Sequence, residues 1–127
     1  MRIFIAGATG VIGSRVAPLL ASDGHTVAGM TRTAAKVDLL RSLGAEPVVC
    51  DVFDADALVA AVRAFRPELI VHELTDLPDN AEDLPAHSFA NARIRVEGTR
   101  NLLAAAAAAE CRGVLAESIA WPLPPGE

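Results

Sequence analysis

The sequence predicts an α/β fold in which helices cover both faces of a doubly wound, parallel β-sheet. Two observations point to this fold class. Segments with strand and helix patterns alternate along the 127 residues. A short apolar segment, residues 2–6, leads directly into a glycine-rich turn and then into a helix. Right-handed crossovers between successive strands then place five strands in the order 3-2-1-4-5.

Five short segments have the apolar composition of strands: residues 2–6, 26–31, 46–50, 68–72 and 113–118. Four longer segments have helical patterns: residues 11–22, 34–43, 55–65 and 88–109. Thr33 and Asp54 are placed to cap the second and third of these helices. Residues 104–109 are all alanine, which gives the fourth helix a strong intrinsic propensity. The polar residues 76–85 contain two prolines and are expected to form a loop.

Length and composition predict a single domain, residues 1–118, followed by a proline-rich tail at residues 119–127. Apolar residues make up 52% of the chain, and the formal net charge is −5. That charge argues against nucleic acid or an anionic membrane as the main partner. Cys50 and Cys111 match no metal-binding spacing, and the N-terminus lacks a signal-peptide pattern. We therefore expect reduced thiols and a cytoplasmic protein.

The turn at residues 7–13 reads Gly-Ala-Thr-Gly-Val-Ile-Gly and has the arrangement of a dinucleotide phosphate site. Its glycines are Gly7, Gly10 and Gly13, and the other residues predicted to bind phosphate are Thr9, Val11 and Ile12. The first glycine permits a tight turn, the second a close approach of the backbone to pyrophosphate, and the third close packing of helix on sheet. The helix start supplies free N–H groups. A P-loop is excluded because no Gly-Lys-Ser/Thr follows.

This Gly-x-x-Gly-x-x-Gly spacing resembles the nucleotide-binding turn of the short-chain dehydrogenase/reductase superfamily. It is most similar to the extended or atypical branch, which includes NAD(P)-dependent epimerases and dehydratases. The resemblance implies a Rossmann-type NAD(P)-binding domain of an oxidoreductase or epimerase acting on a sugar-nucleotide or carbonyl substrate. It also implies a sheet truncated after the fifth strand, because family members are longer. A glycine-rich turn in another kind of α/β protein is the alternative.

Two later segments extend the resemblance to the cofactor. Residues 50–52 resemble the family's Asp-apolar pair beside the adenine ring, which implies that role for Asp51 and Val52. Asp51 could also cap the turn that follows it. Residues 71–75 resemble the strand end that borders the nicotinamide ribose, which implies that role for Leu74 and Thr75.

Residues 96–103 resemble the family's Asn-Val-x-Gly-Thr-x-x-Leu-Leu helix, but Arg95 stands where that motif begins with Asn. This departure puts in doubt the proton relay that the Asn serves in the family. Arg93, Arg95 and Arg100 could simply form a solvated face of the helix. His72 lies at a strand end without an obvious carboxylate partner, so we expect a structural role for it.

The end of the second strand indicates which dinucleotide is preferred. NAD-binding proteins commonly have an Asp or Glu there, which accepts hydrogen bonds from the adenosine ribose. This chain has Arg32 there, and the hydroxyl groups of Thr31 and Thr33 on either side could add contacts to the cofactor. A guanidinium can pair bidentately with a 2′-phosphate, so the residue chemistry favours NADP over NAD. Alternatively, Arg32 is an ordinary exposed arginine.

The chain contains no tyrosine. Ser118 lies where the resemblance places a catalytic Ser or Thr, but the family also uses a Tyr-x-x-x-Lys acid/base that is absent here. The chain could therefore be the cofactor-binding part of an enzyme, or a non-catalytic module that senses NADP or binds another protein. An unprotected sheet edge at the fifth strand predicts self-association.

Overall fold

The structure, a computed structural model, describes residues 1–74, 89–90 and 92–116. Its strands are β1 (Arg2–Ala6), β2 (Thr26–Thr31), β3 (Ala45–Val49), β4 (Leu69–His72) and β5 (Gly113–Ala116). Its helices are α1 (Gly13–Ser22), α2 (Val37–Ser42), α3 (Ala55–Phe65) and α5 (Thr99–Ala108), with a 3₁₀ turn η1 (Ala34–Lys36) and a π-helical segment η3 (Ile94–Gly98).

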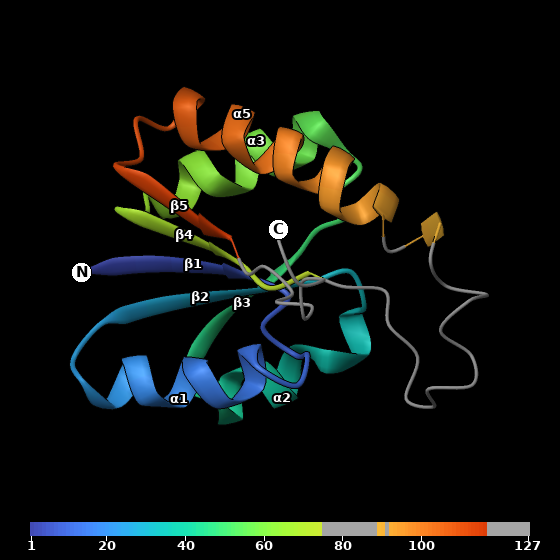
Figure 1. The fold of residues 1–127 in the computed structure, drawn as a ribbon. Coiled ribbons are helices and arrows are strands. Elements are labelled where there is room, and N and C mark those ends of the chain that lie inside the picture. The colour runs from blue at the N-terminus through green and yellow to red at the C-terminus, as the bar shows by residue number, and fades with distance from the viewer. Residues whose placement is uncertain (75–88, 91, 117–127) are drawn as a thin grey trace, which may run out of the picture.

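The strands form one sheet in the order β3-β2-β1-β4-β5, and all neighbours run parallel. This confirms the strand order and the α/β class that the sequence predicts. Helices α1 and α2 cover one face of the sheet, and α3 and α5 cover the other (Figure 1). The order reverses at β1, which pairs with β2 on one side and with β4 on the other. In parallel sheets of this kind, ligands bind beyond the carboxyl ends of the strands at such a reversal.

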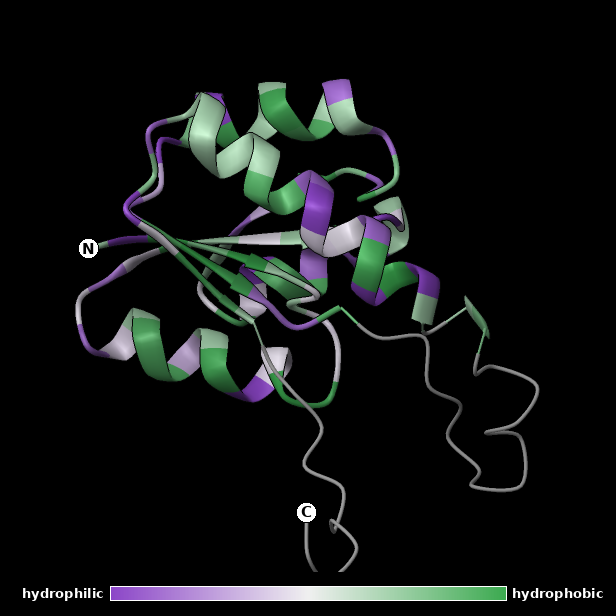
Figure 2. Ribbon diagram, turned by 45° about the horizontal axis from the view of Figure 1, so that its top comes forward, coloured by the Kyte–Doolittle hydropathy of each residue, from purple (hydrophilic) through white to green (hydrophobic). Residues whose placement is uncertain are grey.

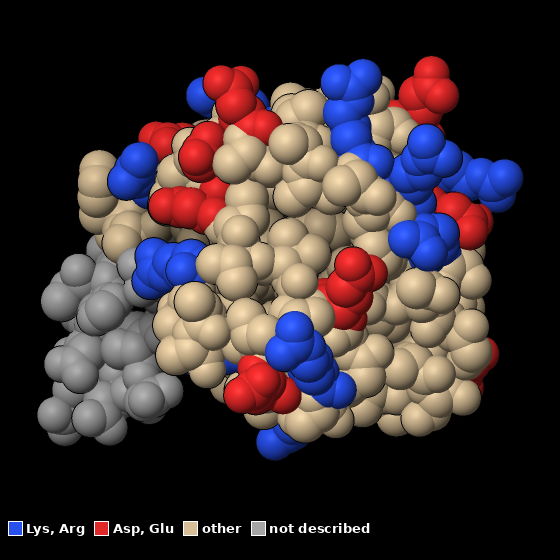
Figure 3. Space-filling view, turned by 180° about the vertical axis from the view of Figure 1, so that it is seen from behind, with Lys and Arg blue, Asp and Glu red and all other residues tan. Residues whose placement is uncertain are grey.

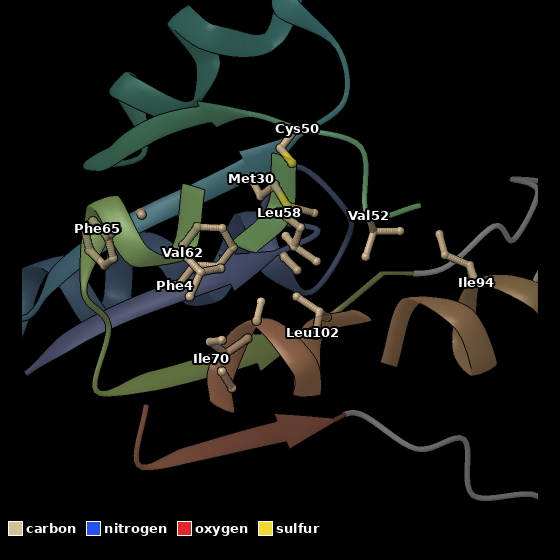
Figure 4. Packing of buried hydrophobic residues seen from close by; sticks show 14 residues of the cluster. Phe4, Met30, Cys50, Val52, Leu58, Val62, Phe65, Ile70, Ile94 and Leu102 are labelled. Carbon is tan, nitrogen blue, oxygen red and sulfur yellow. The ribbon is translucent and has the colours of Figure 1, made fainter. Parts of the chain in front are cut away.

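Each face of the sheet packs its own hydrophobic cluster. The cluster under α3 and α5 contains Phe4, Met30 and Leu102, whose side chains point into one shared layer (Figure 4). The cluster under α1 and α2 contains Ile5 and Leu40. Successive residues of β1 thus face opposite clusters, as the two-residue period of a strand requires. Both faces are buried, so the strands are apolar almost throughout (Figure 2).

The two helical segments on the side of α1 and α2 differ from the prediction. The first α-helix begins at Gly13 rather than residue 11, because the turn continues to Ile12. Residues 34–43 form η1 and then α2 instead of one α-helix. Thr33 makes no side-chain cap. The Lys36 N–H, which such a cap would accept from, donates instead to the backbone carbonyl of Thr33 at 3.1 Å.

On the other face, Asp54 caps α3 as predicted, and its Oδ1 accepts from the Ala57 N–H at 3.2 Å. The predicted helix over residues 88–109 is helical through its described part, but η3 interrupts its α-helical hydrogen bonding. Such π turns are rare and recur at functional sites. The predicted loop at 76–85, the end of the fifth strand at 117–118 and the tail at 119–127 lie outside the described residues.

The two edges of the described sheet are β3 and β5. On β5, the Leu115 side chain is 60% exposed. Self-association through this edge stays a prediction. Elsewhere on the surface, basic and acidic side chains lie close to one another, as the face in Figure 3 shows. No described helix has the length and apolar character needed to cross a bilayer.

Candidate functional site

The glycine turn lies directly after β1 and is built from backbone. Gly7 has φ +87°, a conformation that side-chain-bearing residues rarely adopt. A Cβ at this position would lie 2.5 Å from the carbonyl oxygen of Glu73, the residue after β4. The Glu73 N–H in turn donates to the Ala6 carbonyl at 2.8 Å. Position 7 therefore requires glycine, because the ends of β1 and β4 approach each other too closely there for a side chain.

The start of α1 presents unused hydrogen-bond donors. Its N-cap, Ile12, supplies no side-chain cap. The Gly10 N–H donates to the Gly7 carbonyl at 3.1 Å, but no carbonyl among the described residues accepts from the N–H of Val11 or Ile12. The Val11 side chain is 75% exposed. Free donors at the positive end of a helix dipole form an anion site.

A cleft of about 590 Å³ opens beyond the carboxyl ends of β1 to β4, at the reversal of the strand order. It is large enough for an extended cofactor rather than a single ion. The sequence-predicted residues that line it are Gly7, Thr9, Gly10, Val11, Thr31, Arg32, Asp51, Val52 and Leu74. Ile12 and Gly13 do not line it, and Thr75 and Ser118 lie outside the described residues.

Two cations lie at the β2 side of the cleft. Arg32 follows β2, and Lys36 closes η1; both line the cleft and are exposed. Neither forms an ion pair with another described residue, whereas Arg41 on α2 pairs with Asp38 at 3.4 Å. Thr31 is buried, and its hydroxyl accepts from Thr33. The positive charge of Arg32 and Lys36 suits an anionic group on the ligand.

The loop at residues 50–53, which we call the β3 loop, forms another side of the cleft. Asp51 Oδ1 accepts from the Phe53 N–H at 2.9 Å, which closes an Asx turn. The capping role considered for Asp51 is thus present, and the carboxylate also lines the cleft. Asn101 on α5 donates from Nδ2 to the Val52 carbonyl at 2.8 Å. Burial, followed by the charges of Asp54 and Asp51, raises the pKa of the Cys50 thiol.

Several cleft residues escaped the sequence reasoning. Phe53 lines the cleft, and the Arg93 guanidinium lies 4.1 Å from the centroid of its ring. Arg93 also pairs with Glu97 at 3.3 Å. Because Arg93 lines the cleft, it belongs to the site and not only to a solvated helix face. The other missed lining residues are Met30, Lys36, Cys50, Glu73, Ala90 and Ile94. Phe53 could have been found from its place directly after the Asp-apolar pair.

His72 and the two cysteines are the other residues whose chemistry the sequence analysis considered. His72 is buried at the end of β4, and its Nδ1 accepts from the Leu74 N–H at 3.2 Å. The bond shapes the backbone where Leu74 enters the cleft. Both cysteines are free, and no group of described residues could hold a metal ion.

Comparisons with known proteins identify where this architecture recurs. Residues 3–121 match the model of the NAD dependent epimerase/dehydratase family. A 3-diazoavenalumate denitrifying reductase from a Streptomyces species is 41% identical over 98% of this chain and 40% of its own length. A UDP-glucose 4-epimerase from Mycolicibacterium smegmatis is 33% identical over 91% of this chain and 37% of its own.

Among solved structures, the Bordetella bronchiseptica enzyme WbmG in complex with NAD is 28% identical, with a TM-score of 0.75. The match covers 91% of this chain and 36% of that one. A short-chain dehydrogenase/reductase superfamily protein from Agrobacterium tumefaciens with bound NAD is also 28% identical, with a TM-score of 0.69. The chain therefore spans well under half the length of the relatives it matches.

Proposed function

The chain belongs to the NAD dependent epimerase/dehydratase family, and we propose that its cleft binds NADP in preference to NAD. It is an NAD-binding domain of this family of epimerases, dehydratases and reductases. The pyrophosphate would lie against the glycine turn and the free N–H groups at the start of α1. Asp51 and Val52 would border the adenine ring, and Leu74 and Thr75 the nicotinamide ribose.

The observation that carries the preference for NADP is the presence in the cleft of two cations, Arg32 and Lys36, that form no ion pair with another described residue. An NAD site usually presents a carboxylate at the end of the second strand, which would repel a 2′-phosphate. Here the Arg32 guanidinium lies at that position, and the Lys36 ammonium lines the same cleft. Charge-assisted bonds from both would favour the phosphorylated ribose. The solved relatives named above hold NAD, so the preference is a proposal about this chain's own residues.

Calorimetric titration of NADPH and NADH into the wild-type chain and into Arg32→Asp tests this proposal. The ratio of the two dissociation constants should shift toward NADH by about 10- to 100-fold, because a charge-assisted hydrogen bond contributes about 1.5–3 kcal/mol. Arg41→Asp is the matched control. Arg41 lies on α2 outside the cleft, so the same change of charge there should leave the ratio unaltered. An unchanged ratio in Arg32→Asp would reject the NADP assignment.

We propose further that the enzyme to which this domain contributes its cofactor site acts on a sugar-nucleotide or carbonyl substrate. The support is the family and its named members, a reductase and an epimerase among them. Hydride exchange with such a substrate needs a general acid/base near the reacting oxygen. The 127 residues contain no tyrosine, so this chain alone should bind the cofactor without consuming it. Steady NADPH absorbance with sugar-nucleotide and carbonyl substrates is the expected result.

The missing tyrosine also favours a second candidate, a non-catalytic module that senses NADP. Turnover by the chain alone would remove that candidate. If calorimetry detects no binding of NADPH or NADH at high micromolar concentrations, both dinucleotide proposals fail and a protein-interaction module is favoured.

A further inference from the structure

The helix formed by η3 and α5 contacts one residue of the β3 loop in two independent ways. Asn101 donates to the Val52 carbonyl across 49 positions of sequence. Gly98 packs against the Val52 side chain, since a Cβ at Gly98 would lie 3.5 Å from Val52 Cγ2. Val52 is 4% exposed and points toward the helix that carries Ile94 (Figure 4). Both the backbone and the side chain of Val52 are therefore fixed by this helix.

The residues on either side of Val52 face the cleft. Asp51 contributes a carboxylate and Phe53 an aromatic ring, and the Asx turn between them fixes their relative position. Arg93, the residue directly before η3, lies over the Phe53 ring. Asn101 itself does not line the cleft. Any effect it has on a ligand must pass through the β3 loop.

We propose that Asn101 is a positioning residue that sets the base selectivity of the dinucleotide site. This proposal rests on the proposed function. With the pyrophosphate at the glycine turn and the ribose near Arg32, the base extends toward β3. Asn101 holds Val52 so that Asp51 and Phe53 present a hydrogen-bond acceptor and an aromatic wall to that base.

The chemistry of Asp51 explains why the position of its carboxylate would determine which base the site prefers. A carboxylate accepts hydrogen bonds and donates none. Adenine has an amino group at its six-position, which donates, whereas hypoxanthine has an oxygen there, which accepts. An Asp51 carboxylate placed at the six-position therefore accepts from adenine but faces another acceptor on hypoxanthine, whose nearest donor is N1–H at the adjacent ring position. Because hydrogen bonds weaken steeply as distance and angle depart from the optimum, a loosened β3 loop loses this discrimination first.

The test compares NADPH with its hypoxanthine analogue by calorimetry, in the wild type and in Asn101→Ala. Wild type should bind NADPH more tightly than the analogue. Loss of the Asn101 bond should weaken NADPH binding by about three- to tenfold and the analogue less, so the selectivity ratio falls. Arg100→Ala, at an exposed position beside Asn101, should keep both affinities. Asn101→Asp has almost the same shape but no donor and should behave like Asn101→Ala.

The remaining outcomes separate the two proposals. Failure of the wild type to bind either dinucleotide rejects the proposed function. Binding without preference for adenine, or an equal loss for both dinucleotides in the Asn101 variants, overturns the positioning role while leaving the function intact. Loss of the thermal unfolding transition in both Asn101 variants also overturns it, because Asn101 would then support the whole fold.

Discussion

The glycine turn and the β3 loop line the same cleft, but they are held in different ways. The turn is fixed by its own backbone and by the close approach of the residue after β4. The β3 loop is fixed by side chains of a helix that begins some forty positions later in the sequence. The glycine turn thus keeps its shape because its glycines have no side chains, whereas the β3 loop keeps its shape because side chains of a distant helix contact it.

The largest expected difference in stability and NADPH binding comes from replacing one glycine by alanine on the side of the glycine turn and one on the side of the β3 loop. In Gly13→Ala, the new Cβ would overlap the Gly7 carbonyl oxygen and lie 2.9 Å from Ala8 Cα, both backbone atoms. We expect a loss of about 3 kcal/mol in the free energy of unfolding, and loss of NADPH binding. In Gly98→Ala, the Cβ meets only side-chain atoms at ordinary contact distance.

Gly98→Ala should therefore keep NADPH binding and leave stability unchanged or raise it by up to about 1 kcal/mol, because Ala is the better helix former. Urea unfolding and calorimetry measure both quantities. Equal effects of the two substitutions would show that the two sides of the cleft do not differ in this way.

A second experiment monitors the β3 loop through Cys50. Burial, with Asp54 and Asp51, raises the pKa of this thiol, so less of the reactive thiolate is present at a given pH. Its labelling by a disulfide reagent near pH 8 should be at least about tenfold slower than that of an exposed cysteine, and should speed up as pH rises toward the raised pKa.

Because Cys50 lines the cleft, saturating NADPH should slow its labelling further. Cys111→Ser isolates the Cys50 signal, and Cys50→Ser provides the blank. Labelling of Cys50 that NADPH leaves unaffected would place the cofactor away from the β3 loop.

The smallest expected effect concerns the other end of the β3 loop. Asp54 caps α3, and Asp54→Ala should lower the free energy of unfolding by about 1 kcal/mol. Asp54→Asn keeps a capping oxygen and should cost much less. NADPH affinity should change little in either variant, because Asn101 and Arg93 hold the loop independently of the cap. A large fall in NADPH affinity with Asp54→Ala would show that the start of α3, rather than Asn101 and Arg93, holds the β3 loop in place.

The sequence predicts well what is local. The glycine turn, the cap at Asp54 and the strand order depend on short patterns and on the handedness of crossovers, and the structure contains all three. The prediction that Thr33 caps the second helix was wrong. The Lys36 N–H that the hydroxyl would cap bonds to the Thr33 backbone carbonyl in the η1 turn, and capping preferences do not distinguish this 3₁₀ turn from an α-helix.

The β3 side of the cleft could not be predicted, because its contacts join distant segments. Asn101 and Arg93 reach Val52 and Phe53 only after the helix packs on the sheet. In the sequence, Arg93 is indistinguishable from the exposed arginines near it. Arg32 could be singled out because it follows directly from the end of a strand, but Lys36 reaches the cleft only through the η1 turn.

The central place of β1 has a consequence for how the chain is made. Translation delivers β1 before both of its neighbours, and Ile3 pairs with Val27 on one side and Leu69 on the other. While the ribosome is still adding residues up to β4, one edge of β1 has no partner, and Phe4 and Ile5 have only part of their final surroundings. Such long-range pairing slows folding and exposes strand edges to other nascent chains. The strand that organises the cofactor cleft is thus also the one that must wait for β4 before both of its edges are paired.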